Sequence, residues 1–201
     1  EQSRAYLKIQ DGCEVFCSYC IVARVRGKHK SVEPKKIYDA IKIAYEFGYK
    51  EIVLTGLNLG SYNYNNEIKF IQIVKNMLEI SSKFGIRIRL SSIEPIYFND
   101  ELISLFKNSE VLCPHAHIPL QSGSDKILKL MNRRYTRENY LNIVEKLYKT
   151  NSNIGISADI MVGFPNEDSN DFKDTYNLCE KSKFIKMHIF RYSNRENTPS
   201  S

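Results

Sequence analysis

An apolar strand followed by an amphipathic helix is a pattern that recurs along this sequence. Short apolar or alternating runs predict six strands, at residues 4–10, 51–55, 86–90, 115–120, 154–162 and 184–190. Apolar residues at helical spacing predict helices between these strands, and the last strand has no such helix after it. Strands that alternate with helices form parallel sheets, so we expect an α/β fold of βα units. Periodicity alone does not separate an open doubly wound sheet from a partial barrel.

Several helix boundaries and faces can also be predicted. Thr136 stands where the N-cap of a helix is expected, and Asp100 is expected to cap a short helix. Phe172, Tyr176 and Cys179 are spaced as the buried stripe of the last helix. With no linker and no change in composition, residues 1–201 are predicted to form one domain.

Composition excludes several classes of protein. Apolar residues make up 42% and charged residues 26%, which is typical of a globular domain and not of a disordered or fibrous chain. No apolar run approaches the roughly 18 residues of a membrane span, so we expect no membrane association. Residues 1–4 do not resemble a secretory signal, and they lack an initiator Met. We therefore expect a piece of a longer protein.

Charge and cysteine content bear on the partner, the cellular compartment and the kind of site. The formal net charge of +6 fits either a phosphate-rich partner or an ordinary basic surface. Five cysteines are present, and three of them fall within eight residues. An odd number so unevenly spaced argues against a disulfide framework. We expect a reducing, cytoplasmic location and a thiolate metal site.

Polar and small residues follow each predicted strand, where parallel βα folds bind their ligands. The second strand leads to Thr55, Gly56 and Asn58, and the third to Ser92 and Glu94. Residues 121–124, the end of the fifth strand at Gly163, and residues 191–193 complete the same rim. Loops are polar in any case, so what favours a site here is the cysteine cluster that follows the first strand.

Cys13, Cys17 and Cys20 are spaced C-x3-C-x2-C on that first loop. Three thiolates suit a cubane iron–sulfur cluster, because they leave one iron open to an external ligand. A zinc ion with His29 as a fourth ligand and three buried core cysteines are the alternatives. Core cysteines do not normally occupy a loop rich in glycine and charge.

The cysteine loop, with Tyr19 before its last cysteine, resembles that of the radical S-adenosylmethionine (SAM) superfamily. Further motifs stand in the order seen in the methylthiotransferases of that superfamily, most similar to those that act on N6-threonylcarbamoyladenosine in tRNA. These motifs are Asp11-Gly12-Cys13, Arg26-Gly27, residues 54–62, Ser91-Ser92-Ile93-Glu94-Pro95, residues 119–124 and Val162-Gly163-Phe164-Pro165. The resemblance covers nearly the whole chain and implies a partial (βα)6 barrel of parallel strands, the radical SAM core.

The resemblance also implies a chemistry and a set of cofactor contacts. In this superfamily a [4Fe-4S] cluster held by three cysteines binds SAM and cleaves it reductively to a 5′-deoxyadenosyl radical. By analogy, Cys13, Cys17 and Cys20 are the cluster ligands. The residues expected to contact the cofactors are Tyr19, Thr55, Gly56, Asn58, Ser92, Glu94, Gln121, Val162 and Gly163. Among them, Thr55 and Gly56 would face the methionine moiety, Ser92 and Glu94 the ribose or amino group, and Val162 and Gly163 the adenine.

The same resemblance implies partners and further domains. Methylthiotransferases carry an N-terminal domain with a second [4Fe-4S] cluster and a C-terminal RNA-binding barrel, and we expect both to lie outside this chain. The expected partners are tRNA and a reductant protein of the flavodoxin or ferredoxin kind. Two departures from the family pattern stand out, since Val32 replaces a usual Arg and Asn166 a usual Gly. Cys113 and Cys179 are expected to be buried and not to serve as ligands.

Basic and aromatic loop residues are candidates for contact with RNA. Arg24, Arg26, Lys28 and Lys30 are expected to contact tRNA phosphates, with a solvated loop as the alternative. Tyr62 and Tyr64 are positioned either to stack on a base or to lie on an ordinary surface.

Two pairs of residues on predicted strands remain open. His115 and His117 share one face of a strand, which favours packed barrel residues over a metal site. Arg87 and Arg89 line either an anion cavity or a solvated edge.

Three functions compete at this point. The leading one is a radical SAM core that methylthiolates C2 of N6-threonylcarbamoyladenosine beside the anticodon. A sister enzyme that acts on prenylated adenosine or on a ribosomal protein aspartate has the same cluster motif. A zinc-stabilised RNA-binding module without catalysis belongs to another class.

Overall fold

The computed structural model describes residues 3–107 and 109–201. Six parallel strands form a curved sheet in sequence order: β1 (Ala5–Asp11), β3 (Glu51–Gly56), β6 (Arg87–Leu90), β7 (His115–His117), β8 (Gly155–Val162) and β9 (Lys186–Arg191). Single bridges from Ile88 to Leu112 and from Ser92 to His117 join the two halves of the sheet between β6 and β7. In the described chain β1 and β9 are not paired with each other, so the barrel is partial.

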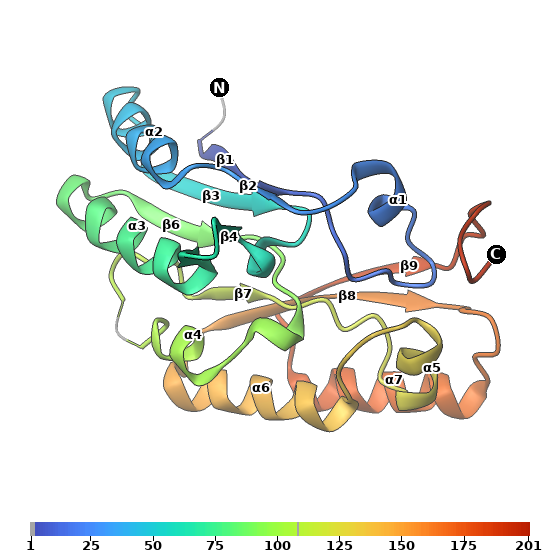
Figure 1. The fold of residues 1–201 in the computed structure, drawn as a ribbon. Coiled ribbons are helices and arrows are strands. Elements are labelled where there is room, and N and C mark those ends of the chain that lie inside the picture. Colours follow the sequence, from blue (N-terminus) through green and yellow to red (C-terminus); the bar gives the residue numbers. More distant parts are fainter. Residues whose placement is uncertain (1–2, 108) are drawn as a thin grey trace.

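Helices cover the outside of the sheet (Figure 1). α2 (Pro34–Glu46) and α3 (Phe70–Phe84) lie over the first half, and α4 (Asp100–Ser104), α6 (Arg137–Thr150) and α7 (Ser169–Ser182) over the second. The predicted (βα) order and the partial barrel are thereby confirmed. No helix within the described ranges is long and apolar enough to cross a membrane.

The six parallel strands of the barrel all point toward one end of the molecule, on the right in Figure 1. That end carries the loop after β1, α1 (Val22–Arg26), β2 (Lys30–Ser31) and α5 (Asp125–Leu130). The short pair β4 (Asn63–Tyr64) and β5 (Ile68–Lys69) and the 3-10 turns Leu59–Ser61 and Pro95–Tyr97 complete the elements. Neither α1 nor β2 was predicted, because each is too short to show periodicity.

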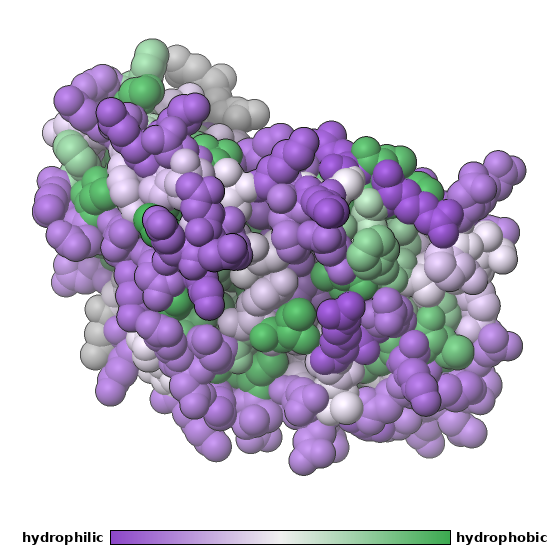
Figure 2. Space-filling view, viewed as in Figure 1, coloured by the Kyte–Doolittle hydropathy of each residue, from purple (hydrophilic) through white to green (hydrophobic). Residues whose placement is uncertain are grey.

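The core lies between the strands and their covering helices. Ile9, Leu54, Ile88 and Ile156 from four strands have no more than 1% of their surface exposed. Figure 2 shows that hydrophilic side chains cover most of one face, with smaller apolar areas between them. Helix capping matches the prediction at Thr136, where a capping box forms with Asn139.

Two details of the helices differ from the sequence prediction. Asn99, and not Asp100, caps α4, since its side chain accepts a hydrogen bond from the amide of Leu102 at 2.8 Å. On α7, Phe172 and Tyr176 are 50% and 54% exposed, so the predicted buried stripe is wrong for both residues. Cys179, also expected to be buried, is only partly buried, packed against the core.

Candidate functional site

The cysteine loop follows β1 at the carboxyl rim of the barrel. Cys13, Cys17 and Cys20 are free thiols, and each is partly exposed. The amide of Cys13 donates to the Gly27 carbonyl at 3.1 Å, and the amide of Cys20 donates to the Cys17 carbonyl at 3.0 Å. These backbone hydrogen bonds fix the conformation of the loop next to α1. None of the three cysteines forms a disulfide within the described chain.

The loop is fastened to the far side of the barrel. The amide of Ser18 donates to the Met131 carbonyl at 3.1 Å, and its hydroxyl donates to the Leu130 carbonyl at 2.8 Å. The Asn132 side chain donates to the Phe16 carbonyl at 2.8 Å. Residues more than 100 positions apart therefore hold the loop in place.

Tyr19, predicted to contact a cofactor, lies among apolar side chains in the structure. Its ring meets Phe164 edge-on with 6.4 Å between centroids, and Phe164 meets Tyr192 in the same way at 5.3 Å. Met131 and Met161 belong to the same small cluster. Burial raises the pKa of the Tyr19 hydroxyl well above its ordinary value. Tyr19 thus anchors the cysteine loop through packing.

A buried ion pair lies beside the loop. The Arg133 guanidinium pairs with the Glu94 carboxylate through both Nη atoms. Arg133 Nη1 also donates to Cys17 Sγ at 3.3 Å. Burial raises the pKa of the Glu94 carboxyl, and the charge of Arg133 opposes that shift. Burial likewise raises the pKa of the Cys17 thiol, again against the effect of Arg133.

A cavity of 350 Å³ opens next to this ion pair. Glu94, Arg133 and Asn58 line it together with Tyr97, and Glu14 and Val15 of the cysteine loop border it; the remaining lining residues are His29, Ile96, Arg134 and Tyr135. Its volume is within the range of roughly 300–1,000 Å³ common for small-molecule sites. Of the predicted cofactor contacts, Asn58 and Glu94 are in this lining.

Three buried side-chain oxygens on the rim lack a hydrogen-bond partner within the described chain. They are Oδ1 of Asn58, Oε1 of Gln121 and Oε1 of Glu167. The Asn58 amide nitrogen donates to Tyr97 Oη at 3.1 Å, and its backbone N–H donates to Gln10 Oε1 at 2.8 Å, so the side chain is held in place. An unpartnered buried acceptor is costly, and a bound ligand with N–H or O–H donors would satisfy it.

The other predicted cofactor residues lie around the same rim, outside the lining of this cavity. Thr55 and Gly56 end β3, and Val162 ends β8 with Gly163 directly after it. The amide of Gly163 donates to the Glu167 carboxylate. Gly56 approaches the Gln10 side chain so closely that a Cβ there would lie 2.9 Å from Gln10 Oε1.

Ser92 and Gln121 occupy the gaps between strands. Ser92 bridges to His117, and Gln121 bridges to Ile160 of β8. Gln121 has a positive φ of 63°, which is uncommon for a residue other than glycine.

The predicted RNA-binding residues Arg24, Arg26, Lys28 and Lys30 are all exposed on α1, β2 and the turn between them. Arg26 is also part of a surface ion pair, with Nη2 at 2.6 Å from Asp11 Oδ2. This pairing lowers the pKa of the Asp11 carboxyl well below its usual range. The other three place positive charge on the rim near the cysteine loop.

His29, the alternative fourth metal ligand, contacts Glu14 and Ser61 in the structure. Its Nε2 is 3.0 Å from Glu14 Oε2, and its Nδ1 is 3.2 Å from the Ser61 hydroxyl. In residues 3–107 and 109–201, no three His, Cys, Asp or Glu side chains are placed to hold a single metal ion. Cys13, Cys17 and Cys20 are free thiols on one loop, and in an iron–sulfur cluster each such thiolate would bind its own iron.

The two strand histidines are hydrogen-bonded within the barrel, as the sequence favoured. His115 Nε2 and His117 Nδ1 both contact the Ser157 hydroxyl, at 3.0 and 2.8 Å. His117 Nε2 also pairs with Asp159 at 2.9 Å. Burial lowers the pKa of His115 to about 4, so its imidazole is neutral at physiological pH.

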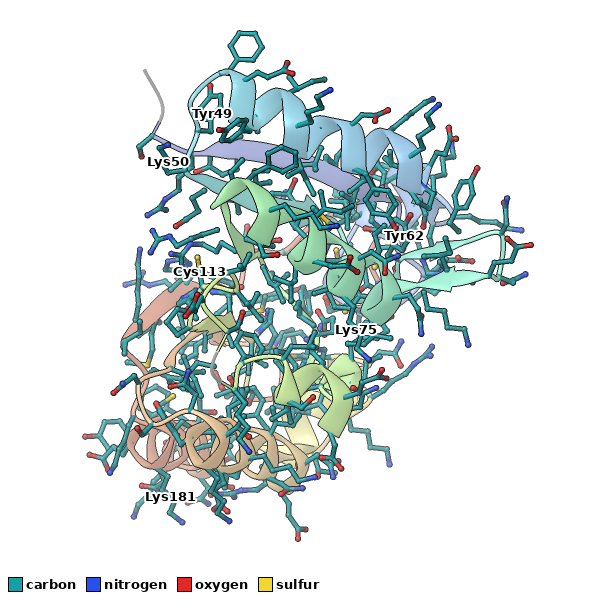
Figure 3. All side chains as sticks on the ribbon, turned by 90° about the vertical axis from the view of Figure 1, so that its left-hand side faces the viewer. Tyr49, Lys50, Tyr62, Lys75, Cys113 and Lys181 are labelled. Carbon is teal, nitrogen blue, oxygen red and sulfur yellow. The ribbon has the colours of Figure 1, made fainter. Side chains whose placement is uncertain are left out.

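Arg87 and Arg89 bind a buried carboxylate at the opposite end of the barrel. Arg87 Nη2 is 2.8 Å and Arg89 Nε is 2.7 Å from Glu51. The thiol of Cys113 is 3.5 Å from the same carboxylate. Cys113, labelled in Figure 3, is 1% exposed.

Tyr62 is not available to stack on a base, so that option is wrong for this residue. Only 1% of its surface is exposed, and its hydroxyl donates to the Val32 carbonyl at 2.7 Å.

The sequence did not predict a role for Arg133, because nothing in a basic pair after a short helix indicates an ion pair with a residue 39 positions earlier.

Fold and site together define a parallel α/β barrel whose carboxyl rim carries a loop of three free thiols beside a polar cavity. A family model described as the radical SAM superfamily matches residues 7–179. The chain therefore belongs to the radical SAM superfamily.

Two curated relatives match along the whole chain. The threonylcarbamoyladenosine tRNA methylthiotransferase MtaB of Thermotoga maritima is 40% identical over 202 residues, which covers 100% of this chain and 46% of that protein. The tRNA-2-methylthio-N(6)-dimethylallyladenosine synthase of Clostridium novyi is 43% identical over 200 residues, covering 98% of this chain and 44% of that protein. The chain thus spans less than half the length of either relative.

Solved structures share the fold at low sequence identity. The radical S-adenosylmethionine methyltransferase TsrM from Kitasatospora setae, with cobalamin and a [4Fe-4S] cluster bound, has a TM-score of 0.80 at 13% identity, covering 98% of this chain and 38% of that one. Methylornithine synthase (PylB) has a TM-score of 0.64 at 14% identity, covering 98% and 55%. These likenesses show a common barrel architecture.

Proposed function

We propose that this chain is the catalytic core of a tRNA methylthiotransferase that cleaves SAM reductively at a [4Fe-4S] cluster. The observation that carries the proposal is the loop of three free thiols at the carboxyl rim, beside the cavity lined by Glu94 and Arg133. The similarity of about 40% to two tRNA methylthiotransferases along the whole chain supports this choice among radical SAM reactions.

Cys13, Cys17 and Cys20 would hold the cluster. When bound, the cluster and SAM supply the one-electron chemistry that acts on an unreactive carbon. The protein's own residues bind, orient and exclude water. Asn58 and Gln121 offer buried acceptor oxygens on the rim, and the remaining predicted contacts, Tyr19, Thr55, Gly56, Ser92, Glu94, Val162 and Gly163, surround the same mouth of the barrel.

The proposed substrate is N6-threonylcarbamoyladenosine beside the anticodon, methylthiolated at C2. Prenylated adenosine is the second candidate, because the Clostridium novyi relative, named for dimethylallyladenosine, is 43% identical to this chain. Exposed Arg24, Lys28 and Lys30, together with Arg26, would contact tRNA phosphates near the cluster loop. A flavodoxin- or ferredoxin-like protein would supply the electron.

The proposal includes parts outside these 201 residues. An N-terminal domain with a second [4Fe-4S] cluster would handle sulfur, and a C-terminal barrel would bind RNA; the greater length of the relatives supports this. Reductive cleavage of SAM needs only the cluster loop and the rim. The chain by itself should therefore form 5′-deoxyadenosine without methylthiolating tRNA.

The test is product analysis of the anaerobically reconstituted chain, reduced in the presence of SAM with and without tRNA. We expect 5′-deoxyadenosine in both cases and no methylthiolated nucleoside. A fully loaded chain that forms no 5′-deoxyadenosine contradicts the radical mechanism. Methylthiolated adenosine made by the chain alone contradicts the need for the further domains. In a longer form that includes them, tRNA bearing each modified adenosine separately distinguishes the two substrates.

A further inference from the structure

Arg133 is a buried cation next to the cysteine loop. Its side chain is 2% exposed, although arginine is rarely buried unless it is paired. It lies three residues after the end of α5, on the segment whose Met131 carbonyl accepts a hydrogen bond from the cysteine loop. The guanidinium and the thiols are thus positioned by the same short stretch of chain.

The guanidinium has a separate partner for each part of its planar group. Nε donates to Tyr135 Oη at 3.2 Å, and the two Nη atoms pair with the Glu94 carboxylate. The ring of Tyr135 also lies 5.2 Å from the guanidinium carbon. Such a fork leaves the cation little freedom to turn away from Cys17.

The hydrogen bond to Cys17 is not needed to pair the charge of Arg133. Glu94 already satisfies the charge of Arg133, yet Nη1 also reaches Cys17 Sγ at 3.3 Å. Hydrogen bonds to ligand sulfurs and the net charge around a cluster are known to set its reduction potential.

We propose that Arg133 is a positioning residue that raises the reduction potential of the cluster held by Cys13, Cys17 and Cys20. It does so by donating an N–H···S hydrogen bond to Cys17 and by fixing a positive charge against that sulfur. The inference rests on the proposed function, which makes these cysteines the ligands.

The sign of the effect follows from charge. Reduction adds one electron to the cluster and leaves the site more negative. A cation buried in contact with a ligand sulfur stabilises the reduced form more than the oxidised form, and burial limits screening by salt. Glu94 holds the guanidinium in place, and its own negative charge keeps the net effect moderate.

The test uses four forms of the 201-residue chain, reconstituted anaerobically: the unaltered chain, Arg133→Lys, the double variant Arg133→Met with Glu94→Gln, and Lys129→Gln. The double variant removes both charges at once, so that the Glu94 carboxylate is not left unpaired. Lys129→Gln is the control, since Lys129 is an exposed cation on α5 that does not line the cavity. The readout is the midpoint potential from a potentiometric titration followed by electron paramagnetic resonance, without SAM, with iron and sulfide content measured alongside.

We expect a lower midpoint potential in the double variant, a smaller decrease in Arg133→Lys, and no change in Lys129→Gln. A normal iron content with an unchanged midpoint in the double variant overturns the inference. Loss of iron from both Arg133 variants but not from Lys129→Gln also overturns it, because Arg133 would then serve assembly and not potential. If the unaltered chain binds no four-iron cluster, the proposed function itself fails.

Discussion

Gly12, directly before Cys13, is where a single added methyl group should disturb the cysteine loop most. Its φ is +75°, and a Cβ built there would lie 2.1 Å from the carbonyl oxygen of Lys28 and 2.8 Å from that of Gly27. Both neighbours are backbone atoms, which cannot rotate away as a side-chain end can. Gly12→Ala must therefore shift the loop itself.

The magnitude follows from two contributions. A left-handed backbone costs a residue with a Cβ about 1–2 kcal/mol. Forcing extra volume into a packed site adds about 1–3 kcal/mol. Gly85→Ala isolates the first contribution, because Gly85 has a φ of +64° and no neighbour within 4 Å of the added Cβ. We expect Gly12→Ala to lose about 2–5 kcal/mol of unfolding free energy and Gly85→Ala only about 1–2 kcal/mol.

Urea denaturation followed by circular dichroism measures both variants, and the shift in midpoint at constant slope gives the difference. Gly12→Ala should also bind less iron after reconstitution, whereas Gly85→Ala should bind the normal amount. If Gly12→Ala is no less stable than Gly85→Ala and retains its iron, the close approach of Gly12 to Lys28 does not shape the loop.

Three further predictions concern two cysteines outside the cysteine loop, the Glu51 carboxylate and the buried Tyr140 hydroxyl. Cys113→Ala and Cys179→Ala should leave iron content unchanged, with a loss of stability of about 1 kcal/mol; reduced iron in either would make that cysteine a ligand. The Arg89 hydrogen bond and charge lower the pKa of Glu51 below its ordinary 4.5, so its stabilising contribution is present above that pH and lost as pH falls through the lowered value. Glu51→Gln should therefore flatten the acid side of a stability–pH curve, and an unchanged acid limb would contradict the role of this carboxylate. Tyr140→Phe removes a 2.8 Å hydrogen bond to the Ile118 carbonyl and should cost about 1–3 kcal/mol in thermal or urea unfolding; no loss would show that the bond is dispensable.

Periodicity was enough to predict the strands and most helices, including β9, which is exposed at every residue, and β8, which is buried on both faces. It failed on α7, where apolar spacing selected Phe172 and Tyr176. The face that α7 buries includes Thr175, whose hydroxyl accepts the amide hydrogen of Gly123 at 2.9 Å. A Cβ at Gly123 would lie 2.6 Å from the Thr175 Cα, so the helix approaches the rim loop through small and polar groups. Hydropathy alone cannot indicate such a face.

The site was predictable where its residues are close in sequence. The three cysteines share one loop, so their spacing alone indicates a common inorganic centre. Glu94 could be placed on the rim, but its partner Arg133 could not, since their contact depends on how the segment after α5 returns to the barrel mouth. The burial of Tyr62 was not predictable either, because this tyrosine lies in a polar stretch of sequence and yet is buried against Val32.

The most direct test of the central claim replaces Cys13, Cys17 and Cys20 with alanine, one at a time. Iron, sulfide and 5′-deoxyadenosine formation from SAM are measured on each reconstituted variant, with circular dichroism as a check of the fold and Cys179→Ala as the control. Each of the three variants should keep its fold and lose 5′-deoxyadenosine formation, while Cys179→Ala retains both cluster and product. A normal cluster together with normal 5′-deoxyadenosine formation in any one of the three would contradict the assignment of this loop as the cluster site.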